Sequence, residues 1–183
     1  LINSFKLKRM TKKILTLVLV VALVFIFSSS AFAQNTSPKV DSFDLFWPMV
    51  AGRTMNDSLY SLKLFKEKLR GMLIFNKPNK ADYLVNLATK RSLEAEKLLK
   101  EEKQDLVDKT LDKMNDSLNT GYSLWQDLKN KNVSDTVKGS LAMKLSKLDI
   151  FLKYLLSISS KDTNSKVDSG LKKLHDFQYT ISL

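Results

Sequence analysis

The sequence lacks several of the residues from which catalytic and metal sites are built. Its 183 residues include no cysteine and one histidine, His175. Without cysteine there can be no disulfide, no thiolate nucleophile and no zinc or iron–sulfur site held by cysteine. One histidine excludes a metal site built from several histidines of one chain. The chain also has no glycine-rich phosphate loop, and no serine stands in a recognisable nucleophile motif. We therefore expect a protein that is not an enzyme.

The first 33 residues follow the pattern of an export signal. An uncharged apolar run from Ile14 to Phe27 precedes Ala31-Phe32-Ala33, a typical cleavage pattern. We expect cleavage before Gln34 and an extracytoplasmic location, either secreted or in the cell envelope. The run is shorter than the roughly 20 residues that span a bilayer, which disfavours the alternative, a membrane anchor formed by residues 14–30. The basic region before the run consists of Lys6, Lys8, Arg9, Lys12 and Lys13.

This N-terminal segment also bears on where translation starts and on the net charge of the mature protein. Met10 is followed by Thr11, Lys12 and Lys13, which makes a more ordinary signal start than Leu1, so we expect translation to begin at Met10. Removing residues 1–33 removes five positive charges and no negative ones, so the formal charge falls from +11 to 11 − 5 = +6. This value is moderately basic and lies below that of a dedicated nucleic-acid binder. The remaining chain suits one domain with its own core.

Residues 34–56 form a lead-in segment with a dense apolar cluster around Pro48. Two interpretations follow. The segment packs across the domain as a lid, or it exposes a patch that binds a partner or lipid. We favour the lid, because so much aromatic surface is costly to leave in water. The residues of the alternative interaction patch are Phe43, Phe46 and Trp47.

The clearest pattern is a narrow apolar seam on a predicted helix over residues 104–130. The spacing alternates between four and three residues, which places all seven positions on one side of a helix. We expect every other long segment after residue 33 to lie against this seam. The seam consists of Val107, Leu111, Met114, Leu118, Gly121, Trp125 and Leu128.

The rest of the chain predicts further amphipathic helices over residues 57–75, 79–102 and 134–158, with a short one over 166–182. Joined by turns of a few residues, they predict an all-α domain over residues 57–183. It is a mostly antiparallel bundle of four main helices plus a short C-terminal helix, preceded by the signal segment. The apolar face of the first helix consists of Leu59, Leu62, Phe65, Leu69 and Met72.

One charged residue falls on an apolar helix side. Arg91 occupies a position in the second helix where an aliphatic residue is expected. It is either an anion-binding group or part of a structural ion pair with Glu94, one turn on, or Glu67, on the preceding helix. We favour the structural ion pair.

Two other groups suggest chemistry only weakly. Asp105, Asp108, Asp112 and Asp116 make a carboxylate row on the seam helix. One helix face cannot converge the six to eight oxygens that calcium requires, so we interpret the row as a solvated surface. His175 lies beside an apolar face and is interpreted as a surface or packing residue. The sequence therefore predicts no catalytic, cofactor or metal site.

Several short motifs carry a family resemblance over about residues 40–130. Asp57-Ser58-Leu59-Tyr60-Ser61-Leu62-Lys63, then Lys66-Glu67-Lys68-Leu69-Arg70, the Phe75-Asn76 turn, Lys80-Ala81-Asp82-Tyr83, and Leu87-Ala88-Thr89-Lys90-Arg91 with Glu94-Ala95-Glu96 stand in order. This resembles an uncharacterised bacterial family of exported helical domains, known only as a domain of unknown function. It departs from the family pattern at Ser61, usually small or proline, and at Leu93, a displaced leucine. The resemblance implies an all-helical exported domain and brings no catalytic residues.

The sequence thus favours an exported, non-enzymatic helical domain that binds a protein or cell-envelope component. The alternative is a weak polyanion binder, acting on lipid head groups, wall polymers or nucleic acid. An enzyme is a third hypothesis, which clustering of Arg91, Glu94 and His175 around one cleft would favour. No cofactor is expected. Membrane contact is expected only if the signal segment is retained. A further candidate partner is an anionic surface.

Overall fold

The computed structural model describes residues 40–128 and 132–182. These belong to a compact unit that runs from Ser37 to Leu183. The predicted signal segment, with the start of the lead-in, lies outside the described residues. Across the part that is described, the chain forms helices and no strand, which confirms the all-α prediction. The helices are α2 (Ser42–Phe46), α3 (Tyr60–Met72), α4 (Lys77–Lys100), α5 (Gln104–Gln126), α6 (Asp135–Ile158) and α7 (Lys161–Ser182).

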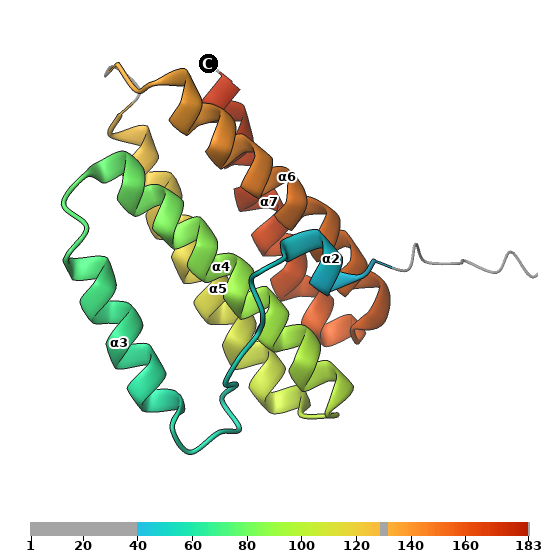
Figure 1. Ribbon diagram of the computed structural model, residues 1–183. Helices are drawn as coiled ribbons and strands as arrows, with labels where there is room; N and C mark the ends of the chain where they lie inside the picture. The colour runs from blue at the N-terminus through green and yellow to red at the C-terminus, as the bar shows by residue number, and fades with distance from the viewer. Residues whose placement is uncertain (1–39, 129–131, 183) are drawn as a thin grey trace, which may run out of the picture. The chain divides into compact units, whose positions relative to one another are not determined.

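Helices α4 to α7 form the bundle (Figure 1). Short connections make α4 and α5 one antiparallel hairpin and α6 and α7 another, and the hairpins meet where α5 packs on α7 and α4 on α6. The chain turns between α4 and α5 at Glu102, whose φ is 57°. The Asn76 side chain caps α4 by accepting from the Asn79 amide at 3.0 Å, and Pro78 lies in the first turn, where its missing N–H costs no helix hydrogen bond. The predicted helical bundle is therefore confirmed.

The C-terminal helix is longer than the sequence suggested. It begins at Lys161 and has 22 residues, whereas the sequence predicts a short helix that begins at residue 166. The polar residues before residue 166 start the helix instead of interrupting it. The Ser160 hydroxyl accepts from the Thr163 amide at 3.5 Å, and the buried Thr163 hydroxyl donates to Asp108 on α5 at 2.8 Å. Helix α7 is consequently a full member of the bundle.

The seam predicted on α5 lies at the centre of the core. All seven of its residues are buried. Gly121 lies at a close approach of three helices, where an added Cβ would be 3.4 Å from both Leu84 Cβ and Phe177 Cε1, at the short end of ordinary van der Waals contact. The facing apolar side of α7 is buried too, through Val167, Leu171, Leu174, Phe177 and Ile181.

Helix α3 lies outside the bundle, along α4 (Figure 1). Its apolar face was expected to lie against the seam, and this expectation was wrong. Leu62 is 63% exposed, Phe65 65% and Met72 63%, and Leu59 and Leu69 are exposed as well. The reason is that α7 occupies the remaining side of the bundle, while α3 turns its polar side towards α4.

The lead-in segment divides between the two interpretations given above. Phe46 of α2 is buried, and its ring meets that of Phe151 on α6 edge-on at 5.3 Å. Phe43 and Trp47 are exposed, with ring centroids 4.8 Å apart. The segment is thus held on the bundle at Phe46, and the two other aromatic residues face solvent.

Candidate docking surface on α3

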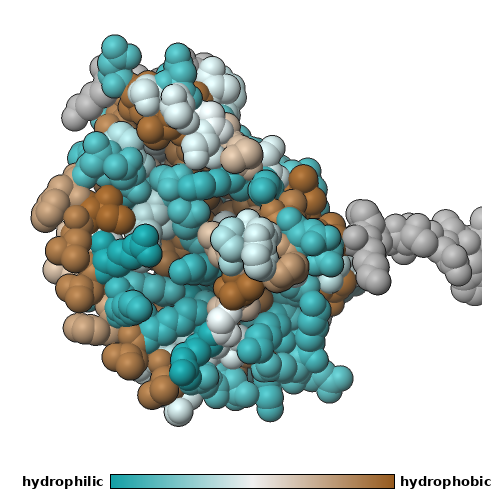
Figure 2. All heavy atoms as spheres, viewed as in Figure 1, coloured by the Kyte–Doolittle hydropathy of each residue, from teal (hydrophilic) through white to brown (hydrophobic). Residues whose placement is uncertain are grey.

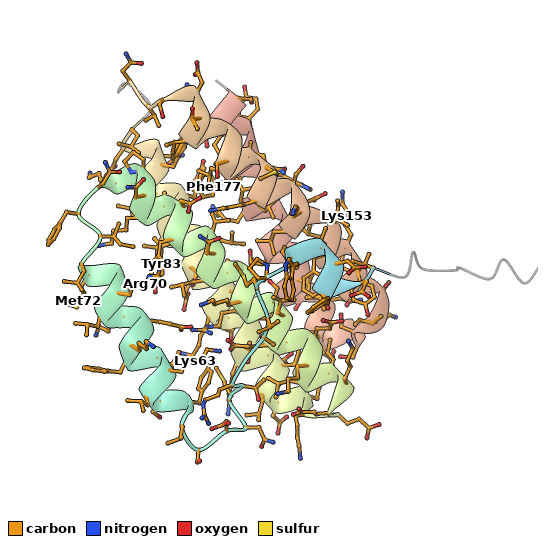
Figure 3. All side chains as sticks on the ribbon, in the orientation of Figure 1. Lys63, Arg70, Met72, Tyr83, Lys153 and Phe177 are labelled. Carbon is orange, nitrogen blue, oxygen red and sulfur yellow. The ribbon has the colours of Figure 1, made fainter. Side chains whose placement is uncertain are left out.

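Seven of the fourteen exposed large hydrophobic side chains among the described residues lie along α3 and the turn after it. Those from Leu59 to Met72 recur at spacings of three and four, so they share one side of the helix, and Leu73 and Phe75 follow directly after the end of the helix. Figure 2 shows apolar residues gathered along the edge of the molecule that α3 occupies, and Met72 points away from the bundle in Figure 3. The exposures range from 47% to 88%. We call this surface the α3 apolar face: Leu59, Leu62, Phe65, Leu69, Met72, Leu73 and Phe75.

The opposite side of α3 carries a buried set of charges, which we call the ion cluster: Lys63 and Glu67 of α3 with Arg91 and Glu94 of α4. The guanidinium of Arg91 bridges both carboxylates, with Nη1 2.5 Å from Glu94 Oε1 and Nη2 bonded to Glu67. The Lys63 ammonium also pairs with Glu94. The side chain of Glu94 is fully buried and that of Arg91 is 4% exposed. Two cations and two carboxylates make the cluster neutral.

Further hydrogen bonds fix α3 in this orientation. The Tyr60 hydroxyl donates to Glu94 Oε2 at 3.1 Å, and the Tyr83 hydroxyl donates to the backbone oxygen of Glu67 at 2.8 Å. Lys63 also donates to the carbonyl oxygen of Arg53 at 2.6 Å. Figure 3 shows Lys63 and Tyr83 between α3 and α4. Turning the apolar face inward would break these bonds and leave buried charges unpaired, so the outward orientation is specified by polar contacts.

The protonation states of the cluster suit a structural role. Burial, together with the neighbouring charge of Glu94, raises the pKa of Tyr60 well above its ordinary value of 10.0, which keeps the phenol protonated and donating. Burial lowers the pKa of Arg91, but Glu94 and Glu67 outweigh burial and the net pKa is raised. Glu94 accepts from Tyr60, Lys63 and Arg91 at once. This geometry fits the structural interpretation of Arg91, because each charged group of the cluster has a partner within it.

A groove of about 240 Å³ runs beside the α3 apolar face, between α3 and α4. We call it the basic groove. The Arg70 guanidinium lies over the Tyr83 ring at 5.7 Å. Within residues 40–128 and 132–182, Lys66, Arg70 and Lys90 form no ion pair, and Glu67 is already paired with Arg91, so the groove has a net positive charge. Sequence reasoning missed it because its cations come from two helices. Its lining residues are Lys63, Lys66, Glu67, Arg70, Tyr83 and Lys90.

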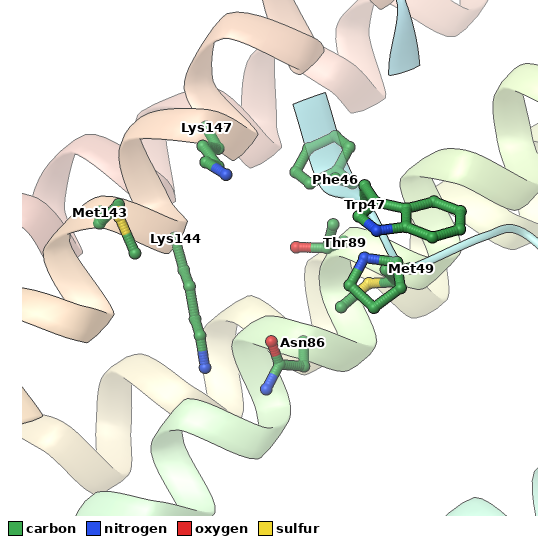
Figure 4. Close-up of a pocket in the computed structure, with 9 residues that line it drawn as sticks. Phe46, Trp47, Met49, Asn86, Thr89, Met143, Lys144 and Lys147 are labelled. Atoms are coloured by element: carbon green, nitrogen blue, oxygen red, sulfur yellow. The ribbon is translucent and has the colours of Figure 1, made fainter. Parts of the chain in front are cut away.

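A second concavity lies beneath the lead-in segment (Figure 4). It has a volume of about 330 Å³ and lies against α4 and α6. Phe46 and Trp47 of the predicted patch line it, whereas Phe43 does not. The Lys144 ammonium in this pocket is held by Asp82 at 2.6 and 2.7 Å. The pocket can hold a small apolar group.

The remaining predicted residues lie apart from the ion cluster. His175 is exposed on α7, with Nε2 2.8 Å from Asp149 Oδ1. Burial raises the pKa of Asp149, but hydrogen bonds from Lys153 and His175 outweigh it, so the net pKa is lowered. Arg91 and Glu94 lie under α3 and make no contact with His175. The arrangement that would have favoured an enzyme is therefore not formed.

The carboxylate row on α5 is partly engaged with α7. Asp112 Oδ1 lies 2.5 Å from the Lys166 ammonium, and Asp108 accepts from Thr163. In the described part of the chain, no group of three or more histidine or acidic residues is placed to hold a metal ion. Nor does this part contain a helix long and apolar enough to cross a bilayer.

These features define a class of protein: an all-α bundle domain that carries an outer amphipathic helix on a buried ion cluster. Residues 52–150 match the family described as "Domain of unknown function (DUF5667)", and the chain belongs to this family. The predicted resemblance to a family known only as a domain of unknown function is thereby confirmed. The match includes α3 and the whole ion cluster and ends within α6, so α7 lies beyond it. No curated protein and no solved structure gives a significant match to the chain.

Proposed function

We propose that this protein is an exported, non-enzymatic helical domain that binds a protein or cell-envelope component through the α3 apolar face. The observation that carries the proposal is the orientation of α3. Six buried or partly buried polar side chains hold the helix so that its apolar residues face solvent. Monomeric proteins rarely expose a contiguous apolar surface of this kind unless it binds something.

The export part of the proposal comes from the sequence alone. The signal pattern of residues 1–33 supports a location outside the cytoplasm, where envelope proteins, lipids and wall polymers are the available partners. The basic groove supports the alternative that the domain binds a polyanion, since three of its cations, Lys66, Arg70 and Lys90, form no ion pair within residues 40–128 and 132–182. In the proposal and in its alternative, the partner binds at α3.

The test is co-sedimentation of the unit from Ser37 to Leu183 with isolated cell envelopes. Phe65→Ser and Leu69→Ser remove apolar area from the α3 face, while Met143→Ser and Ile150→Ser remove comparably exposed apolar side chains from α6. We expect the α3 variants to lose binding and the α6 variants to keep it. Equal binding by both pairs would contradict the proposal, as would a hydrolytic or transferase activity that is lost on a single polar substitution.

A further inference from the structure

The α3 apolar face is bordered by positive charge on both sides. Lys66 is four residues from Leu62 and three from Leu69, so it lies along one edge of the face. Lys68 is three residues from Phe65 and four from Met72, so it lies along the other edge. Both lysines are exposed, and neither forms an ion pair within the described residues.

No negative charge accompanies these lysines on the outer side of α3. Between residues 59 and 75 the only acidic residue is Glu67, and its carboxylate faces α4, where Arg91 holds it. The basic groove continues the Lys66 edge towards α4 through Arg70 and Lys90. The exposed side of α3 therefore combines a continuous apolar strip with charge of a single sign.

The sign of this charge selects among the occupants of the face. A second copy of the chain, docked through the same face, would bring Lys66 and Lys68 against their own copies with no acid between them. An uncharged apolar protein surface would leave the lysines unpaired. An anionic bilayer surface offers negative phosphates around an apolar interior, which matches both parts of the face.

The dimensions of α3 also suit an interfacial helix. Its 13 residues extend for about 20 Å, enough to lie in the plane of a membrane surface and far too short to cross it. Leucine and phenylalanine on one side with lysine and arginine at the borders are typical of helices that lie in the headgroup region. The basic groove, at about 240 Å³, has room for a phosphate group between Lys66, Arg70 and Lys90.

We propose that α3 binds the surface of an anionic phospholipid bilayer. The α3 apolar face enters the boundary between head groups and acyl chains, and the basic groove receives a lipid phosphate. This inference rests on the proposed function, because it names the envelope component that α3 contacts. It requires no retained anchor, since the contact is made by the folded domain.

The experiment uses the compact unit from Ser37 to Leu183, which contains every residue of the core, so the apolar run at Ile14–Phe27 does not contribute. Its sedimentation is measured with vesicles of phosphatidylglycerol and phosphatidylcholine, and with vesicles of phosphatidylcholine alone. We expect binding to the mixed vesicles that weakens as salt is added, and little binding to the neutral ones.

Matched variants separate the two parts of the face. Phe65→Ser should weaken binding to the anionic vesicles by at least about tenfold, and the control Ile150→Ser on α6 should not. Lys66→Glu with Lys68→Glu should weaken it by about tenfold or more and reduce its salt dependence, whereas Lys109→Glu with Lys172→Glu, exposed lysines of other helices, should not. Circular dichroism checks that each variant is folded.

The other possible results separate the lipid inference from the proposed function. Equal binding to neutral and anionic vesicles, or equal binding by Phe65→Ser and Ile150→Ser, overturns the lipid inference. Displacement by free glycerol phosphate at matched ionic strength also overturns it, because the ligand is then a soluble phosphate. If Phe65→Ser instead abolishes self-association or envelope binding without affecting vesicles, the lipid inference fails and the proposed function stands. If it affects none of these, both fail.

Discussion

Replacing Arg91 by methionine should release α3 while leaving the bundle folded. The substitution keeps an unbranched apolar stem and removes the guanidinium that bridges Glu67 and Glu94. Two charge-assisted hydrogen bonds are lost, each worth about 1.5–3 kcal/mol. Lys63 still pairs with Glu94, and Glu67 is partly exposed and can be hydrated. The loss of interaction free energy therefore lies near the lower end of the sum for two bonds, at about 3 kcal/mol. Because α3 contributes few apolar contacts to the core, this loss should appear as local opening.

Amide hydrogen exchange followed by mass spectrometry measures that opening. A loss of about 3 kcal/mol predicts exchange on the order of 100-fold faster in residues 60–72, with α4, α5, α6 and α7 still protected. Lys90→Met, one position away and outside the ion cluster, is the matched control and should leave the rates in α3 nearly unchanged. The reasoning is refuted if α3 stays protected in Arg91→Met, or if protection falls equally in all helices.

Three further predictions concern packing, a turn and pH. Gly170→Ala should destabilise the protein by about 1–3 kcal/mol, because its Cβ would lie 2.6 Å from Met114 Cε and 2.8 Å from Asn115 Oδ1. Gly139→Ala, where a Cβ meets nothing within 4 Å, should stabilise it by about 1 kcal/mol. Urea titration measures the free energy of unfolding of both variants. A change of the same sign in both would count against the packing described. Glu102→Gly should raise stability by about 1 kcal/mol, because φ is 57° there; a lower thermal midpoint would contradict this. Since the pKa of Tyr60 is raised above 10.0, its contribution to stability is complete below pH 10 and is lost as the pH rises above it. Tyr60→Phe should therefore lose less stability between about pH 9.5 and about pH 11 than the wild type or the exposed control Tyr179→Phe. If the stability of Tyr60→Phe falls with pH as much as that of the wild type, the assigned role of Tyr60 is contradicted.

The bundle could be predicted because its signal is local and periodic. The seam residues of α5 recur every three or four positions, and all of them are buried. The turns at Asn76 and Pro78 likewise carry their own capping chemistry. Such features depend on neighbours in sequence, and the order of helices joined by short turns follows from them.

The placement of α3 could not be predicted in this way. Its apolar periodicity is as clear as that of α5, and periodicity alone assigns such a face to the core. What decides its orientation is the fit of Lys63 and Glu67 to Arg91 and Glu94, which lie 24 to 31 residues further along the chain. Arg91 on an apolar helix side was the one signal of this, because a buried arginine requires carboxylates to cover it.

The length of α7 was missed for a different reason. The polar stretch from Ser159 to Ser165 reads as a linker by composition, yet Ser160 and Thr163 satisfy the first turn of the helix and bond to α5. Residues of this type favour both turns and helix starts, so only the tertiary partner decides between them. The basic groove was missed for a similar reason, because it exists only when α3 lies beside α4.

The most direct test of the central claim is the accessibility of single cysteines placed on the α3 apolar face. The natural chain has no cysteine, so each introduced thiol reports only its own position. Leu62→Cys and Leu69→Cys should react with a water-soluble maleimide about as fast as Met143→Cys, an exposed reference on α6, and far faster than Leu118→Cys in the core. If the two α3 thiols instead react as slowly as the one at position 118, the apolar face is covered within the domain and the account of α3 as a docking helix is contradicted.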